Sequence, residues 1–514
     1  MITKKKRYLN NLFILILGVI TSFSLPPYNY WIINFLTFSL LYIILYKNKN
    51  EGFKFFFIYG YTFGFGYFAS SLYWISYSLS FDNNFKFLIP FTVILIPLLI
   101  SFFFGIGFLI FKFFINSKNF INILVFSVIL GLIEFIRGSI FSGFPWNLFA
   151  YSLSENIRFI QITSITGLYG FNTILITIFT LPSLLFLKRF KTDVFGFIFI
   201  IILFVTIYIY GFIRVNEIKN LQTEILPLEI KILSTKIPIE RFYSSLDNEE
   251  IIKKLINLSN PIENQETIFI WPEGVIPGMN LASFKFEYDY LINKYFSEKH
   301  LIILGINDEE VKKDKFLFYN SLSIIDNEAN TIYKYYKNRL VPFGEFLPLE
   351  KYLKKIGLKT LTNNYQSYSP SGERKIYEYS KNSKIKILPL ICYEIIYSGK
   401  ISNNNDYNFI VNISEDGWFG NSIGPYQHFA HSIFRSVEYG KYTLRSANNG
   451  ISAIIDPSGL IVDKLNISKE GGISITRIKN VDKTFFSTYG NKSYYLIILL
   501  YIFFIFSFKK LDNE

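Results

Sequence analysis

Long runs of apolar residues dominate roughly the first two hundred positions of this 514-residue chain. Several of these runs are long enough for a helix to cross a lipid bilayer. We predict membrane-spanning helices at 10–27, 28–46, 55–80, 87–115, 120–140, 159–187, 193–213 and 494–508. The basic residues Lys4 to Arg7 precede the first run, as in a signal peptide, but no small-residue cleavage pattern follows it. We therefore interpret the first run as a retained helix. The pattern predicts a membrane domain over residues 1–213 and a last helix with a tail over 491–514.

Residues 214–490 follow a different pattern, with frequent charged residues and apolar runs of strand length. The clearest of these short runs are Ile230 to Leu233, Thr267 to Trp271, Leu301 to Leu304, Ile385 to Ile391, Phe409 to Ile413 and Ile451 to Ile455. Between them, Glu249 to Leu258 and Gln427 to Tyr439 repeat apolar positions with the period of a helix. Short buried strands that alternate with helices predict an α/β domain, and this one is long enough to form its own core.

Basic residues in the loops predict the orientation of the membrane helices. They cluster at Lys4 to Arg7, at Lys47, Lys49 and Lys54, at Lys112 and Lys118, at Lys188, Arg189 and Lys191, and at Lys509 and Lys510. If seven helices precede the α/β domain, all these clusters lie on one side, which the positive-inside rule identifies as the cytoplasm. The opposite loops, at 26–30 and 81–87, carry little positive charge. Seven crossings then place the α/β domain outside the cytoplasm.

Composition excludes several classes of protein. Hydrophobic residues make up 51% of the chain and the mean hydropathy is +0.30, which is too apolar for an ordinary soluble enzyme. The net charge of +13 is partly explained by the basic loops, and no arginine-rich or aromatic-interleaved motif indicates a nucleic-acid partner. A single cysteine, Cys392, excludes disulfides within the chain and makes a thiolate metal site a poor interpretation.

Three polar residues follow predicted strands: Glu273, Lys337 and Cys392. If these strands are neighbours in a sheet, their carboxyl ends lie at one edge, where sites in α/β proteins usually form. A thiol attacks an acyl carbon as the thiolate, so Glu273 could remove its proton and Lys337 could stabilise the resulting negative charge. Each residue alone also has a plainer interpretation, because lone cysteines are often buried and charged residues after strands are usually solvated.

The segments around these residues resemble a known superfamily. They read Trp-Pro-Glu-Gly at 271–274, Tyr-Lys-Asn-Arg-Leu-Val-Pro-Phe-Gly-Glu at 336–345 and Ile-Cys-Tyr-Glu at 391–394, similar to the Glu-Lys-Cys segments of the nitrilase superfamily. With Gly-Phe-Pro-Trp-Asn-Leu-Phe-Ala-Tyr-Ser at 143–152 and Arg-Ser-Ala-Asn-Asn-Gly-Ile-Ser at 445–452, the chain resembles the apolipoprotein N-acyltransferase family within it. The resemblance covers nearly the whole chain, including the membrane helices that a soluble nitrilase would lack.

This resemblance implies both a fold and an activity. The fold would be a multi-span α-helical membrane domain plus an extracytoplasmic nitrilase-like α-β-β-α sandwich, in the bacterial cytoplasmic (inner) membrane. A phospholipid would donate an acyl chain to a cysteine thioester, and the α-amino group of a diacylated apolipoprotein would accept it. Glu273 would be the base, Lys337 the electrostatic stabiliser and Cys392 the nucleophile. The supporting residues would be Glu345, Tyr393 and Glu394. The resemblance implies a monomer without a cofactor or metal.

The sequence departs from the family pattern at a few positions. Leu-Ser-Thr-Lys-Ile-Pro-Ile at 233–239 replaces a segment that usually resembles Gln-Gly-Asn-Ile-Pro, and Glu415 and Gly417 differ from the usual Asn-Asp-Ala. Ala150 and Lys441 replace Gly and Arg. None of these changes affects the Glu-Lys-Cys trio, so we expect activity to survive. We expect any effect to be on the preference for the acyl chain or for the acceptor.

Three other functions remain as alternatives. A papain-type hydrolase would need a histidine base, for which only His300, His428 and His431 exist, and the last two also have the spacing of a metal pair on a helix. A membrane-anchored amidase would use the same trio with water as acceptor. A transporter or sensor would place function in the spans, where Glu134 and Arg137 can pair on one helix face. We interpret this pair as structural or as part of a substrate mouth.

Overall fold

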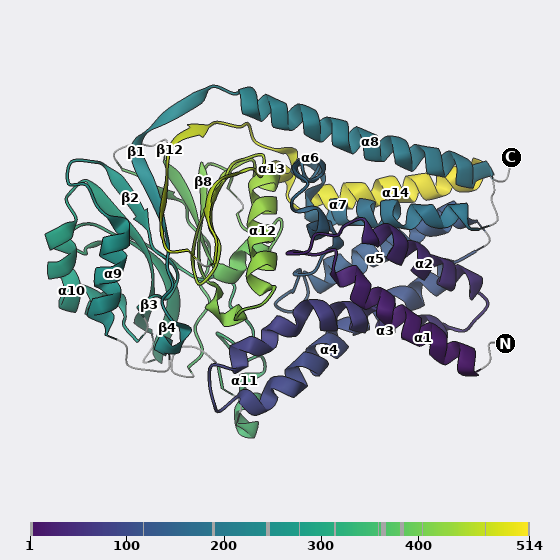
Figure 1. Ribbon diagram of the computed structural model, residues 1–514, viewed down its shortest axis with the longest axis horizontal. Coiled ribbons are helices and arrows are strands. Elements are labelled where there is room, and N and C mark those ends of the chain that lie inside the picture. The colour runs from purple at the N-terminus through teal and green to yellow at the C-terminus, as the bar shows by residue number, and fades with distance from the viewer. Residues whose placement is uncertain are drawn as a thin grey trace. The chain divides into compact units, whose positions relative to one another are not determined.

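The computed structural model describes residues 4–116, 118–187, 191–242, 247–276, 278–312, 315–357, 359–360, 366–380, 385–402, 404–467 and 469–511. The chain divides into two compact units, whose elements are labelled in Figure 1. The helical unit comprises Met1–Ser76, Phe87–Glu217 and Thr484–Glu514. The α/β unit comprises Tyr77–Lys86 and Ile218–Lys483. The domain boundaries predicted at 213/214 and 490/491 stay predictions.

A helix lies at each of the eight apolar segments predicted from the sequence. These helices are α1 (Lys4–Ser22), α2 (Ile33–Lys47), α3 (Phe53–Leu72), α4 (Ile89–Phe114), α5 (Asn119–Arg137), α7 (Thr163–Thr180), α8 (Lys191–Asn220) and α14 (Lys492–Leu511). Among the described residues, five helical stretches are long and apolar enough to cross a membrane: Lys86–Phe114, Asn119–Arg137, Thr163–Leu185, Lys191–Asn220 and Lys492–Lys510. The apolar helices Arg7–Ser22 and Ile33–Lys47 are shorter. The count of eight crossings stays a prediction.

Close contacts between backbones hold part of the helical unit together. A Cβ atom on Gly18 would lie 2.2 Å from the carbonyl oxygen of Phe63, and one on Gly60 would lie 2.4 Å from that of Phe104. Glycine at these positions therefore lets α3 pack directly against α1 and α4, as small residues do between membrane helices.

The predicted pair on α5 is present in the helical unit. Arg137 Nε donates to Glu134 Oε2 at 3.0 Å, and both side chains are buried. The Arg137 guanidinium also donates to the carbonyl oxygen of Phe144 and lies 5.2 Å from the centre of the Phe68 ring. These contacts tie the loop after α5 to its own helix, which favours the structural interpretation of the pair.

The α/β unit contains two six-stranded sheets. One has the order β12-β1-β2-β3-β4-β5 and the other β11-β10-β9-β8-β7-β6. Their bounds are β1 (Thr223–Ser234), β2 (Thr267–Ile270), β3 (His300–Lys312), β4 (Lys315–Ile325), β5 (Thr331–Tyr336), β6 (Tyr377–Glu378), β7 (Lys386–Ile391), β8 (Phe409–Glu415), β9 (Tyr442–Asn448), β10 (Ser452–Ile455), β11 (Ile461–Leu465) and β12 (Gly471–Lys479). All six short apolar runs singled out in the sequence lie on these strands.

Helices cover the outer faces of the two sheets, as Figure 1 shows. Helices α9 (Asn248–Ser259) and α10 (Leu281–Tyr295) share a buried apolar core with β1, β2 and β3. Helix α12 (Gly424–Tyr439) packs on the second sheet. The inner faces meet where Ser446 Oγ on β9 donates to the carbonyl oxygen of Leu233 on β1 at 2.7 Å. The predicted α-β-β-α sandwich is therefore confirmed.

Candidate functional site

The three predicted catalytic residues follow the carboxyl ends of strands in two facing sheets. Lys337 comes directly after β5 and Cys392 directly after β7, and Glu273 lies three residues after β2. The expectation of neighbouring strands in one sheet is wrong. Strands β3 and β4 separate β2 from β5, and β7 belongs to the other sheet. The residues converge because the two sheets pack face to face, so the ends of their strands share one edge of the sandwich.

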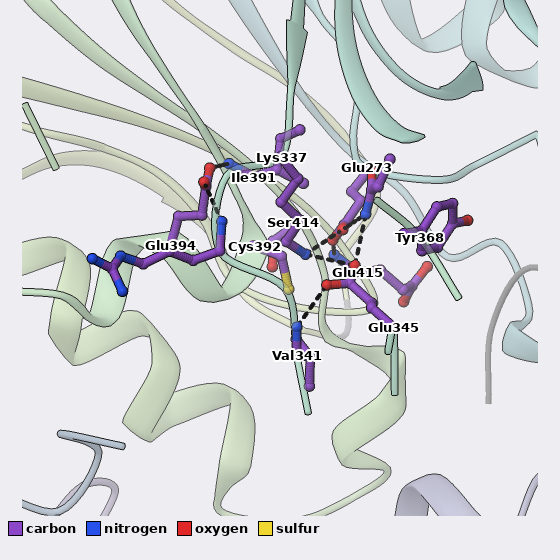
Figure 2. A network of polar contacts seen from close by, with 12 residues as sticks. Glu273, Lys337, Val341, Glu345, Tyr368, Ile391, Cys392, Glu394, Ser414 and Glu415 are labelled. Carbon is purple, nitrogen blue, oxygen red and sulfur yellow. Dashed lines mark hydrogen bonds and ion pairs between the residues drawn. The ribbon is translucent and has the colours of Figure 1, made fainter. Parts of the chain in front are cut away.

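Lys337 lies between two carboxylates, as Figure 2 shows. Its Nζ atom is 3.2 Å from Glu273 Oε1 and 2.8 Å from Glu345 Oε1, and all three side chains are buried. Burial by itself lowers the pKa of Lys337, but the charges of Glu273 and Glu345 outweigh it, and the pKa lies well above its usual value. The ammonium group is therefore a fixed positive charge in the site at any physiological pH.

A fourth side chain, Asn320 on β4, connects the same two carboxylates. Its Nδ2 atom donates to Glu273 Oε1 and to Glu345 Oε1, each at 2.8 Å. The sequence analysis missed this residue. Its signal was a polar side chain in the apolar strand Phe-Leu-Phe-Tyr-Asn-Ser-Leu-Ser, where an inward-facing amide needs a hydrogen-bonding partner. Together with Lys337, Asn320 holds the carboxylates of Glu273 and Glu345 in place against the repulsion between their negative charges.

Cys392 occupies a strained turn and is almost fully buried. It has a φ of 48°, which is uncommon for a residue other than glycine, and it begins the 3₁₀ turn Cys392–Ile396. Burial raises the pKa of the thiol most, Glu273 raises it further and Lys337 lowers it, so that the pKa lies well above its usual value. The resting thiol is therefore protonated at neutral pH, and attack on an acyl group requires a base to remove the proton at that moment.

The three supporting residues lie in different surroundings. Glu345 belongs to the charged cluster, where its Oε2 atom also accepts from the backbone N–H of Val341 at 2.8 Å. Tyr393 packs edge-on against Tyr397, with ring centres 5.4 Å apart. Glu394 accepts from a separate set of donors, which includes Arg374.

Glu394 links the segments that carry Lys337 and Cys392. Its Oε2 atom accepts from the backbone N–H of Ile391 at 2.9 Å, and its Oε1 atom accepts from the N–H of Asn338 at the same distance. Arg374 Nη2 balances its charge at 2.7 Å. These contacts indicate that Glu394 fixes the backbone on either side of the cluster.

The histidines do not form a catalytic or metal-binding group of the expected kinds. His428 Nδ1 lies 3.0 Å from Asp416 Oδ1, and burial lowers the pKa of His428 so that it stays neutral. His300 accepts from the N–H of Ser297 in a separate part of the unit. Across the described residues, no three His, Cys, Asp or Glu side chains are placed to hold a metal ion. The charges that act on the Cys392 thiol are those of Glu273, Lys337 and Asp416, whereas His428 bonds to the backbone of Cys392. This favours the Glu-Lys-Cys interpretation over a papain-type site, in which a histidine would bond to the thiol.

The opposite effects of these two partners on the thiol predict opposite changes in its reactivity. Glu273→Gln should lower the pKa of Cys392, so the midpoint of the pH dependence of its alkylation by iodoacetamide should move to lower pH. Lys337→Met should raise the pKa and slow alkylation. In the unmodified protein the rate should rise with pH well beyond pH 9, because the pKa is raised. The measurement is the alkylated fraction over time by mass spectrometry at a series of pH values. A midpoint at higher pH in Glu273→Gln than in the unsubstituted protein would contradict this electrostatic account.

Comparisons with known proteins match both units. One family model, the apolipoprotein N-acyltransferase N-terminal domain, matches residues 17–181, and another, carbon-nitrogen hydrolase, matches residues 237–482. A relative from Rickettsia typhi, named apolipoprotein N-acyltransferase, is 34% identical over 494 residues, which are 94% of this chain and 95% of the relative. A relative of the same name from Rickettsia prowazekii is 34% identical over 505 residues, which are 96% of this chain and 97% of the relative. Among solved structures, an amidase from Nesterenkonia sp. has 9% identity and a TM-score of 0.32, covering 52% of this chain and 94% of its own.

Proposed function

The chain belongs to the apolipoprotein N-acyltransferase family, an enzyme family of the nitrilase superfamily, and on this basis we propose its reaction and the residues that perform it. The acyl donor is a phospholipid, and the acceptor is the α-amino group of the lipid-modified N-terminal cysteine of an apolipoprotein. The observation that carries the assignment of residues is the buried contact of Lys337 with Glu273 and Glu345 beside Cys392. This cluster supplies a base, a cation and a nucleophile without a cofactor.

The first half of the reaction transfers the acyl chain to the enzyme. Glu273 removes the proton from Cys392 Sγ as the sulfur attacks the carbonyl carbon of the phospholipid ester. The oxyanion that forms is stabilised by the ammonium group of Lys337. When the intermediate collapses, the carbon–oxygen bond of the ester breaks, and Glu273 returns the proton to the leaving alkoxide. The products are a lysophospholipid and a thioester on Cys392.

The second half transfers the acyl chain to the acceptor. The neutral α-amino group attacks the thioester carbonyl carbon, and Lys337 again stabilises the oxyanion. Glu273 takes a proton from the attacking nitrogen while the carbon–sulfur bond breaks. The proton then returns to the Cys392 sulfur, so that the free enzyme and an amide-linked acyl chain result. Glu345 keeps Lys337 charged and in place, and Glu394 and Tyr393 hold the backbone around it.

The thioester is the intermediate that tests this proposal. The detergent-solubilised protein is incubated with phospholipid and no acceptor, and peptides containing Cys392 are analysed by mass spectrometry. We expect a mass increase of one acyl chain that hydroxylamine removes and that an added diacylated lipopeptide takes up. An unmodified thiol with turnover of a soluble amide would instead indicate a membrane-anchored amidase and overturn the proposal.

We propose that the protein is a monomer of the bacterial cytoplasmic (inner) membrane with its α/β unit on the extracytoplasmic side. The basic loops support this orientation, although Lys188 and Arg189 lie outside the described residues. A reporter enzyme that works only outside the cytoplasm should be active when fused near Lys312 and inactive when fused after Lys510. Equal activity at both positions would place them on the same side of the membrane. The predicted number of crossings would then be wrong by an odd number.

A further inference from the structure

The turn that carries Glu273 is held by a buried arginine, Arg241, in the 3₁₀ turn Ile239–Phe242. The Nε and Nη2 atoms of Arg241 donate to the carbonyl oxygen of Gly274, the residue after Glu273, at 3.2 and 2.9 Å. Its Nη1 atom donates to the carbonyl oxygen of Pro238 at 2.9 Å. One guanidinium group therefore links the segment after β1 to the turn after β2.

The same arginine forms an ion pair with Glu415, the last residue of β8. The backbone N–H of Glu415 donates to Glu273 Oε2 at 2.9 Å, whereas Lys337 and Asn320 donate to the other oxygen, Oε1. The Glu415 carboxylate accepts from Asn448 Nδ2 at 2.6 Å and from the N–H of Gly417 at 2.7 Å. The backbone N–H of Glu415 thus holds one oxygen of Glu273. The carboxylate of Glu415 holds Arg241, which in turn holds the backbone after Glu273.

The surrounding backbone leaves little room for this arrangement to shift. A Cβ atom on Gly417 would lie 2.6 Å from Glu415 Oε1, so the carboxylate fills the space that a side chain at 417 would need. A Cβ atom on Gly305 would lie 2.5 Å from the Cα atom of Glu273. The turn is therefore clamped between β3 on one side and the Arg241–Glu415 pair on the other.

We propose that Arg241 and Glu415 are positioning residues for acyl transfer, which orient Glu273 toward Cys392. This inference rests on the proposed function, in which Glu273 is the base. Their side chains act through Glu273: the Arg241 side chain holds the turn after it, and the Glu415 carboxylate holds Arg241. A base must lie within hydrogen-bond reach of the proton it removes, and an error of about 1 Å in such a position can slow a reaction about 10²-fold.

Arg241→Lys separates positioning from charge balance. A lysine retains the charge that Glu415 needs in a buried site, so folding should survive. It cannot reproduce the planar set of donors that reaches Gly274, Pro238 and Glu415 together. We expect single-turnover thioester formation to fall roughly 10- to 100-fold, with an unchanged KM for phospholipid and a folded protein whose melting temperature is only modestly lower. Arg477→Lys, at an exposed position on β12, makes the same chemical change away from the turn and should keep the normal rate.

A second variant covers the case in which Arg241→Lys fails to fold. The double variant Arg241→Gln with Glu415→Gln removes both charges, so neither is left buried without a partner. We expect it to bind phospholipid normally and to form the thioester slowly. A normal rate in either folded variant would overturn the positioning role. Cys392→Ala is assayed in parallel: if it still transfers acyl chains, the proposed function itself fails, whereas a normal Arg241→Lys rate beside an inactive Cys392→Ala overturns only this inference.

Discussion

Cys392→Ala should lose acyl transfer from phospholipid completely, because no other side chain among the described residues can form the thioester. Cys392→Ser should be nearly as inactive, since a hydroxyl group has a much higher pKa than a thiol and Glu273 is too weak a base to activate it. Removing the nucleophile of an enzyme that uses a covalent intermediate has cost on the order of 10⁶ in rate. The measurement is the transfer of a fluorescent acyl chain from phospholipid to a diacylated lipopeptide, followed by gel.

The fold must be intact for this result to be interpretable. Cys392→Ala loses the hydrogen bond between the thiol and Ser414, a small change. The left-handed φ of 48° is about as costly for alanine as for cysteine, so both variants should insert into the membrane at normal levels. Glu345→Gln is a useful comparison, because it weakens the contact with Lys337 and leaves the nucleophile in place. It should be slow but measurable. Activity of more than a few per cent in Cys392→Ala would remove Cys392 from the mechanism.

Six of the twelve strands that the structure describes in the α/β unit, namely β1, β2, β3, β7, β8 and β10, could be predicted from apolar runs in the sequence because this signal is local. β8, for example, lies where Phe409 to Ile413 form a short apolar run that is buried on both faces. The pairing of the strands has no such signal. β2 and β5 are separated by two other strands, and β7 lies in the facing sheet, since the order is set by packing between distant segments.

The same limit applies to the site. Glu273, Lys337 and Cys392 could be singled out because they follow strands and lie in segments that resemble a family. Asn320 was marked in the sequence only as a polar residue in an apolar strand, and Arg241 had no comparable signal, because each acts through atoms far away in the sequence. Asn320 and its partner Glu273 are 47 positions apart in the sequence, and Arg241 and its partner Glu415 are 174 positions apart.

The departures from the family pattern also make more sense in three dimensions. Glu415 and Gly417 looked like two unrelated changes in the sequence. In the structure the carboxylate of Glu415 occupies the place of a Cβ atom at 417, and Arg241 balances its charge. We therefore expect Gly417→Ala to displace the Glu415 carboxylate.

Lys337→Ala should slow thioester formation about 10²- to 10³-fold, which corresponds to ~3–4 kcal/mol of lost transition-state stabilisation. The ammonium group is the positive charge that faces the reacting thiol, and its removal also leaves Glu273 and Glu345 facing each other across Asn320. Lys337→Arg should be nearly as slow. The guanidinium group is larger and planar, and a side chain with 1% exposure between two carboxylates has no room for it.

Lys334, three residues earlier and on β5, provides the matched control for this prediction. Its Nζ atom is bound to Asp308 Oδ2 at 2.6 Å, and its side chain is 39% exposed. Asp308 is buried but also accepts from the hydroxyl group of Tyr336 at 2.7 Å, so its carboxylate keeps a donor in Lys334→Ala, and this variant should form the thioester at close to the normal rate. The comparison is made in single-turnover assays with fluorescent phospholipid in detergent. A normal rate in Lys337→Ala together with a slow one in Lys334→Ala would exchange the roles of the two lysines. A buried ammonium group held by two carboxylates argues for the opposite outcome, because only a charge that is already fixed and shielded from water can stabilise an oxyanion without first being reorganised.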